Sequence, residues 1–253
     1  MPSAGTHHTA GRGTVVTMLA LRNPHSVLAT LDARPRDVIE VRLPGGRAQG
    51  AWDRVAAEAS RHGRPVVPVE RDARPGREGG RSGAEAVIRE REPVGLDRLF
   101  AGEHDRGLWL ALDGVQDPHN AGAIFRAAAF FGVRGVVMTA DRSVGLTSVV
   151  YDVASGGMEA VPYAVETNLR RALQAAKDAG IWIIGSSEHA KKDVTAVQAD
   201  RPWLLVLGNE ESGLRRLTLE TCDEVCRITP RGTAVTSLNV GVAAGILMAA
   251  LTR

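Results

Sequence analysis

A turn rich in Asp, Asn and Gly, lying after a long apolar run, is the first part of the chain that could do chemistry. Residues 113–126 read DGVQDPHNAGAIFR, so this turn leads into a helical pattern. Asn is among the best residues for capping a helix, and Asn120 could cap a helix that carries Arg126. Arginine suits contacts to phosphate groups. A capped helix with a solvated arginine is the alternative, and the local pattern leaves both interpretations open.

Two glycines that flank acidic residues mark a second segment, directly after the apolar run 203–207. Gly208 and Gly213 would let the backbone approach a ligand closely, and a carboxylate between them, such as Glu210, could orient a hydroxyl or an amine. The segment lacks the Lys and Ser/Thr of a P-loop and the spacing of a dinucleotide-binding fingerprint. Binding of a nucleotide phosphate is therefore disfavoured here.

The third segment, residues 228–240, reads ITPRGTAVTSLNV and runs into an apolar helical pattern at 241–251. Ser237 is a natural cap for that helix. Exposed backbone groups before the helix could hold the edge of an adenine. Capping alone is the alternative function of these residues.

Strands and helices that alternate along the chain are expected to position these three segments. The strand-like apolar runs are 108–112, 135–139, 181–184 and 204–207, and the helical patterns between them are 121–131, 148–158 and 169–179. This alternation predicts a parallel sheet that is covered on both faces. Ligands of such sheets bind beyond the carboxyl ends of the strands, where the first two segments begin.

A smaller α/β unit is expected before this sheet. Its pattern has helices at 23–31 and 52–61 and strands at 38–43 and 65–69, whereas 71–81 is charged, rich in Gly and Pro, and typical of a loop. The start of the chain lacks the features of a signal peptide, and the apolar stretch 240–251 is too short to cross a bilayer. We therefore expect a cytoplasmic protein with no membrane partner.

Composition adds little about function. A net charge of +2 and 44% hydrophobic residues are ordinary for a folded protein and argue against disorder. Only three of the 31 basic residues are lysines, which suits phosphate contacts but is equally explained by a biased base composition. Cys222 and Cys226 have no second pair nearby, so inert thiols are favoured over a zinc site or a disulfide.

Taken together and in order, the three segments resemble the SpoU/TrmH branch of the SPOUT RNA methyltransferases over residues 108–253. That family's motifs read N-x-G-x-x-x-R, then G-x-E-x-x-G-L, then a proline followed by S-L-N-V. The matching residues are Asn120, Gly122 and Arg126, then Gly208, Glu210, Gly213 and Leu214, then Pro230, Ser237, Leu238, Asn239 and Val240. The N-terminal unit resembles the ribosomal-protein-L30e-like RNA-binding domain of the ribosomal RNA members, although residues 81–86 stand where many relatives have His-Gln-Gly.

The resemblance implies a particular α/β architecture. A parallel-sheet SPOUT domain with a deep trefoil knot would occupy residues 108–253, after an L30e-like domain at 14–100 and a linker at 101–107, with a disordered tail at 1–13. It also implies a homodimer formed through the C-terminal domain, RNA as a partner, and S-adenosyl-L-methionine as the cofactor.

The resemblance further assigns roles to residues, with no metal. The expected cofactor-binding residues are Leu207, Gly208, Gly213, Ile228, Pro230 and Leu238, and the expected catalytic residues are Arg126, Asn120, Glu210, Ser237 and Asn239. Because a guanidinium stays protonated in proteins, we prefer Arg126 as a group that holds the neighbouring phosphate and stabilises a developing alkoxide, not as a base.

The implied activity is 2'-O-ribose methylation of RNA, most simply of a guanosine in 23S rRNA. A transfer RNA enzyme, or a thiostrepton-resistance-type enzyme acting on adenosine, has a related layout. A non-catalytic RNA-binding or ribosome-assembly protein is a further alternative. An oxidoreductase that uses a nucleotide cofactor is disfavoured, because no G-x-G-x-x-G follows a strand.

Overall fold

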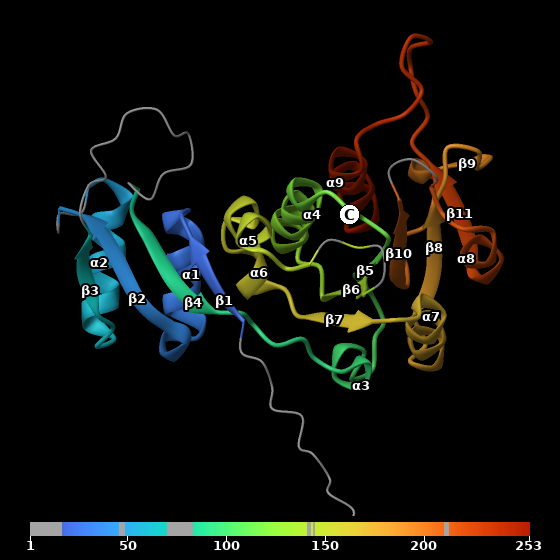
Figure 1. The fold of residues 1–253 in the computed structure, drawn as a ribbon. Helices are drawn as coiled ribbons and strands as arrows, with labels where there is room; N and C mark the ends of the chain where they lie inside the picture. The colour runs from blue at the N-terminus through green and yellow to red at the C-terminus, as the bar shows by residue number, and fades with distance from the viewer. Residues whose placement is uncertain (1–16, 46–48, 70–82, 141–142, 144, 210–212) are drawn as a thin grey trace, which may run out of the picture.

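Two β-sheets organise the chain in the computed structural model (Figure 1). The structure describes residues 17–45, 49–69, 83–140, 143, 145–209 and 213–253. None of the helices in these ranges is long and apolar enough to cross a membrane.

The first sheet has four strands in the order β1-β4-β2-β3. Its strands are β1 (Met18–Leu21), β2 (Val38–Pro44), β3 (Val66–Val69) and β4 (Glu85–Arg89), and its helices are α1 (Pro24–Ala33) and α2 (Ala51–Arg61). Strand β4 pairs antiparallel with β1 and β2, while β2 and β3 are parallel. The helices and the strands β2 and β3 confirm the sequence pattern, whereas β1 and β4 were not predicted.

The second sheet has seven strands in the order β7-β6-β5-β10-β8-β11-β9, and all of its described pairs are parallel. Its strands are β5 (Gly107–Asp113), β6 (Gly135–Thr139), β7 (Tyr163–Glu166), β8 (Trp182–Ser186), β9 (Lys192–Asp193), β10 (Pro202–Gly208) and β11 (Glu224–Arg227). Its helices are α3 (Leu96–Leu99), α4 (Pro118–Phe130), α5 (Ser148–Ala154), α6 (Gly157–Ala160), α7 (Leu169–Asp178), α8 (Arg216–Thr221) and α9 (Val240–Leu251). The predicted parallel sheet is confirmed.

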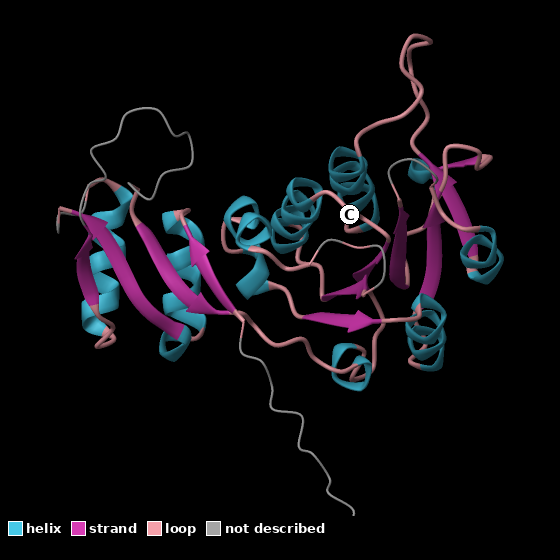
Figure 2. Ribbon diagram, in the orientation of Figure 1, coloured by secondary structure: helices cyan, strands magenta, loops and turns pink. Residues whose placement is uncertain are grey.

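Side chains of the central strands alternate between two apolar cores. Leu108, Leu110 and Leu112 of β5 enter the core under α4, α5 and α9, whereas Trp109 and Ala111 enter the core under α3 and α7. Figure 2 shows these two groups of helices on opposite sides of the sheet. Burial on both faces explains why β5 is apolar throughout and does not alternate with polar residues.

The predicted single helix at 148–158 is wrong, because it breaks into α5 and α6. Ser155 has a φ of 50° and Gly156 a φ of 99°, and such left-handed backbone cannot continue an α-helix. The break forms a tight turn between the two short helices. This turn faces α1, which packs with the first sheet.

Candidate functional site

The carboxyl ends of β5 and β10 lie side by side. The two strands pair in register, with Leu207 opposite Leu112 and Gly208 opposite Asp113. The segment 113–126 and the segment that begins at Gly208 therefore start next to one another. This is the arrangement expected for neighbouring strands of a parallel sheet.

A buried carboxylate ties the loops after these two strands together. Asp113 is 2% exposed. Its Oδ2 accepts a hydrogen bond from the Thr218 hydroxyl at 3.2 Å, and its Oδ1 lies 3.2 Å from the Arg215 guanidinium without hydrogen-bond geometry. The Asn209 side chain also donates to the Gly114 carbonyl at 2.9 Å. These contacts fix the loop after β10 to the end of β5.

Two glycines lie where the chain comes close to itself after β10. Asn209 and Gly213 exchange backbone hydrogen bonds of 3.2 and 2.9 Å. A Cβ on Gly208 would lie 2.3 Å from the Gly213 carbonyl carbon, and Gly213 has a φ of 65°. No side chain fits at the first position, and the second favours glycine, so the backbone at Gly208 can lie against that at Gly213. Leu207 and Leu214 on either side are buried, and Glu210 lies outside the described residues.

Helix α4 begins differently from the sequence prediction. Asp117 is its N-cap and accepts from His119 N at 2.8 Å, with Pro118 at the first helical position. The expectation that Asn120 caps this helix is therefore wrong. Asn120 lies inside the first turn, is 9% exposed, and accepts a hydrogen bond from the Asn239 side chain at 2.9 Å.

Asn239, not Ser237, caps the C-terminal helix α9. Its Oδ1 accepts from Gly241 N at 2.9 Å and Val242 N at 3.3 Å, while its Nδ2 donates to Asn120. The Ser237 cap was a wrong prediction, because the helix starts at Val240, too late for Ser237 to reach its first amides. The Asn120–Asn239 hydrogen bond brings the first and third segments together.

The rest of the third segment lies in solvent. Residues 229–239 are exposed and run far out from the sheet between β11 and α9 (Figure 1). Pro230, Ser237 and Leu238 belong to this excursion, and Leu238 is 48% exposed. Within the described residues, no hydrogen bond joins these three residues to the backbone at Gly208. Ile228 is half-buried against the core at its base.

Asp193 holds the first residue of this excursion in place. Its carboxylate accepts from Thr229 N at 3.1 Å and from the Thr195 hydroxyl at 2.6 Å. Hydrogen bonds from Thr195 and then Thr229 keep the pKa of Asp193 well below its usual range. The segment is thus fixed at both ends, by Asp193 and by Asn239, and exposed between them.

Arg126 lies on the exposed surface of α4. Within the part of the chain that the structure describes, no hydrogen bond or ion pair of its guanidinium is found. Its backbone is well fixed, because a Cβ on Gly157 of α6 would lie only 2.9 Å from Arg126 N. A fixed backbone and a solvent-facing guanidinium suit a residue that binds an anionic ligand.

Sequence reasoning missed Asp113, Asn209, Arg215 and Thr218. Thr218 is 105 residues from Asp113, so no local pattern could reveal that pair. A signal did exist for Asp113, which is the first charged residue after the apolar run of β5.

Two further expectations from the sequence concern the cysteines and metal binding. Burial raises the pKa of Cys222 to about 11 and that of Cys226 to about 12, so both are protonated, unreactive thiols at neutral pH. Across the described ranges, no three His, Cys, Asp or Glu side chains gather in a way that could hold a metal ion.

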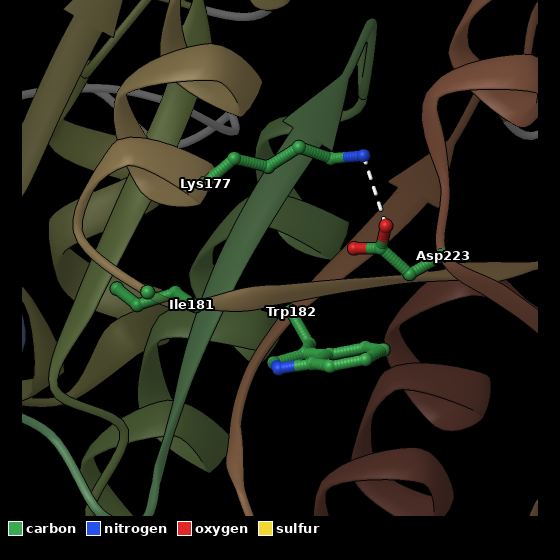
Figure 3. Close-up of a pocket in the computed structure, with 5 residues that line it drawn as sticks. Lys177, Ile181, Trp182 and Asp223 are labelled. Carbon is green, nitrogen blue, oxygen red and sulfur yellow. Dashed lines mark hydrogen bonds and ion pairs between the residues drawn. The ribbon is translucent and has the colours of Figure 1, made fainter.

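A shallow hollow lies at the opposite end of the sheet (Figure 3). Lys177 and Asp223 form an ion pair of 2.9 Å across it, and Trp182, the first residue of β8, contributes its ring. Because parallel sheets bind their ligands at the carboxyl ends of the strands, this hollow is separate from the candidate site.

Comparisons with known proteins find RNA methyltransferases and RNA-modifying enzymes. The model of the SpoU rRNA Methylase family matches residues 107–249. The 23S rRNA (guanosine-2'-O-)-methyltransferase RlmB of Bordetella pertussis is 38% identical over 227 residues, which cover 88% of this chain and 92% of that protein.

Two solved structures are also similar. The SpoU methyltransferase AviRb from Streptomyces viridochromogenes, in complex with AdoMet, has a TM-score of 0.76 at 22% identity, and the match covers 93% of this chain and 89% of that one. The A. aeolicus TrmH/SpoU tRNA modifying enzyme has a TM-score of 0.52 at 25% identity, and the match covers 62% of this chain and 81% of that one.

Proposed function

The chain belongs to the SpoU rRNA methylase family, and we propose that it transfers a methyl group from S-adenosylmethionine to the 2'-hydroxyl of a guanosine in 23S rRNA. The observation that supports this substrate is the 38% identity to the 23S rRNA (guanosine-2'-O-)-methyltransferase of Bordetella pertussis, which extends over 92% of that protein. This match includes most of both units of the chain.

The residues at the end of β10 fit the proposed cofactor. Gly208 and Gly213 leave backbone groups without side chains over them at the end of β10, between the buried Leu207 and Leu214. Such backbone groups suit the hydrogen-bonding edge of an adenine. When bound, S-adenosylmethionine supplies an electrophilic methyl group. By the family resemblance, the residues that would hold it are Leu207, Gly208, Gly213, Ile228, Pro230 and Leu238, although Pro230 and Leu238 lie in the exposed excursion 229–239 in this structure.

We assign Arg126 to the ribose side of the reaction. Its guanidinium would bind the phosphate next to the target ribose and stabilise negative charge that develops on the 2'-oxygen. Asn120 and Asn239, which are joined by their hydrogen bond, would orient the substrate together with Glu210 and Ser237. The 2'-hydroxyl proton would leave to a phosphate oxygen or to water. The protein's main contribution would be to position the reacting groups.

The extent of the matches favours ribosomal RNA over transfer RNA. The relative that acts on 23S rRNA covers 88% of this chain, whereas the match to the tRNA modifying enzyme covers 62%. The additional N-terminal residues would then serve to bind a larger RNA, as an L30e-like domain at 14–100, joined by a linker at 101–107 to a SPOUT domain at 108–253. If bacterial ribosomal RNA is the substrate, the protein would act in the cytoplasm.

We further propose that two copies associate through α4 and α9 and that the C-terminal domain is knotted. Phe130 of α4 is 82% exposed, and Val242 and Ile246, four residues apart on one face of α9, are 53% and 40% exposed, so both helices carry exposed apolar side chains. Burial of such side chains favours association. The knot is supported by the return of the chain from β11, near one edge of the sheet, to pack α9 against α4.

Radiolabelled methyl transfer tests the proposed activity. The purified protein, incubated with tritiated S-adenosylmethionine, should label 23S rRNA and not tRNA, and complete digestion should release the label as 2'-O-methylguanosine. Arg126→Ala should abolish labelling and leave cofactor affinity, measured by calorimetry, within about twofold. Arg170→Ala, an exposed arginine on α7, is the matched control. Cofactor binding without transfer to any RNA would favour a non-catalytic assembly protein, and labelled adenosine would favour the thiostrepton-resistance-type alternative.

A further inference from the structure

We propose that Glu159 and Asp152 are positioning residues, which hold the N-terminal unit rigidly against α5 and α6 and so set its distance from Arg126. The N-terminal unit is defined here as residues 17–45, 49–69 and 83–89. The consequence for catalysis rests on the proposed function, in which this unit binds RNA. The docking itself stands on the contacts between the two units.

An almost fully buried ion pair lies at the centre of this contact. Arg34, at the end of α1, donates from Nε and from a terminal nitrogen to the two carboxylate oxygens of Glu159, each at 2.8 Å. The two side chains are 14% and 5% exposed. Burial alone would lower the pKa of Arg34, but its hydrogen bond to Glu159 and the carboxylate's charge raise it. The buried Thr30 hydroxyl also donates to Glu159, at 3.1 Å. A carboxylate so deeply buried requires these partners to stay in place.

A second carboxylate accepts hydrogen bonds from the backbone just before α1. Asp152 of α5 accepts from Arg22 N at 3.0 Å and from Asn23 N at 2.9 Å. The Asn23 side chain donates to the Asp152 carbonyl at 2.7 Å, while its oxygen caps α1 by accepting from His25 N at 2.9 Å. The residue that begins α1 is therefore also bound to α5. Asp152 and Glu159 thus hold the two ends of α1.

Close packing fills the space between these polar contacts. The Ser26 hydroxyl, 2% exposed, donates to the Tyr151 carbonyl at 2.7 Å. A Cβ on Gly156, in the turn between α5 and α6, would lie 3.1 Å from the Cβ of Ala29. Val27 and Leu31 share one continuous apolar core with Val150 and Tyr151. Such a contact resembles the interior of a domain more than a flexible junction.

The same two short helices rest on the helix that carries Arg126. A Cβ on Gly157 of α6 would lie 2.5 Å from the Phe125 carbonyl oxygen, and a Cβ on Gly122 of α4 would lie 2.6 Å from Val153 of α5. No room for sliding exists at either contact. A rigid path therefore runs from α1 through Glu159 and Asp152 to α4. An RNA segment bound to the N-terminal unit would lie at a fixed distance from the 2'-hydroxyl beside Arg126, which raises the effective concentration of that ribose.

The test compares the full-length double variant D152N/E159Q with the wild type, with Glu220→Gln as the control. Glu220 is an exposed carboxylate whose ion pair with Arg216 lies within α8. Small-angle scattering of the double variant should show a larger radius of gyration, and calorimetry should split one unfolding transition into two. The KM for 23S rRNA should rise at least tenfold, while kcat at saturating RNA and the cofactor Kd stay within about twofold. The control should change none of these.

Unchanged scattering together with an unchanged KM in the double variant would overturn the proposal. If the double variant does not fold, Asn23→Ala replaces it, because this change removes the side-chain contacts to Asp152 and Ser155 from the N-terminal unit alone. A wild-type protein that methylates no RNA would refute the proposed function, whereas the scattering and unfolding experiments would still decide whether Asp152 and Glu159 hold the two units together.

Discussion

Asn239 does two things at once, because its Oδ1 caps α9 and its Nδ2 donates to Asn120. Local patterns predicted that Gly208 and Gly213 let the backbone approach a ligand, and in the structure the backbone at these two glycines comes close to itself. They failed on both helix caps, because a cap depends on where the first helical hydrogen bond forms, and several polar residues near a helix start qualify equally well. The Asp113 contacts could not be predicted, because their partners lie far away in the sequence.

Asn239→Ala should reduce both stability and activity. It removes the cap of α9, which is worth about 1 kcal/mol, and the hydrogen bond to Asn120, worth about 1 kcal/mol more. Urea unfolding measures the first effect and methyl transfer the second. Asn168→Ala is the control, since Asn168 caps α7 through Arg170 N at 3.0 Å. The control should lose only stability, and equal losses of activity in the two variants would refute a role for Asn239 in the site.

At the scale of elements, periodicity predicted the strands that are buried on both faces and the long helices between them. It missed the short strands β1, β4, β7 and β9, whose few residues carry little pattern. It also joined α5 to α6, because Ser155 in a left-handed conformation is uncommon and no local rule predicts it.

The tyrosine of α5, Tyr151, is 1% exposed, and its hydroxyl accepts a hydrogen bond from Arg91 N at 3.0 Å. Alkaline pH should destabilise the fold through this tyrosine. Burial raises the pKa of Tyr151 from 10.0 to about 12, so between these values the unfolded chain loses the proton while the folded chain keeps it. The free energy of unfolding should therefore fall as pH rises above 10, by ~2–3 kcal/mol from this residue once pH passes its folded pKa. Urea midpoints at pH 8, 10 and 11 measure the slope. Tyr151→Phe should flatten it in part, since burial also raises the pKa of Tyr163, and an unchanged slope would contradict this assignment.

At the scale of the whole molecule, the alternation of strands and helices predicted the parallel sheet. It could not predict the order of the strands or the docking of the N-terminal unit. Strand β10 lies between β5 and β8, and the chain visits α7 and β8 before it forms β10. Such an order depends on contacts between distant segments. The exposed apolar side chains of α4 and α9 likewise lie on neighbouring helices only once the two helices pack together.

Ile246→Glu should convert the protein from a dimer to a monomer. The change places a charge in the apolar surface of α9, where a partner would otherwise bury it without a counter-ion. Sedimentation equilibrium gives the mass directly. Leu217→Glu is the control, because Leu217 is 69% exposed on α8, away from this surface. A wild type that is monomeric at micromolar concentration would contradict the proposed association.

The most direct test of the account maps ribose methylation in cells that carry the gene, lack it, or carry only its Arg126→Ala form. A 2'-O-methyl group blocks alkaline cleavage of the adjacent phosphodiester, so sequencing of hydrolysed 23S rRNA locates each mark. We expect one protected guanosine that is present with the wild-type gene, absent without it, and absent with Arg126→Ala. An identical methylation pattern in all three strains would contradict it.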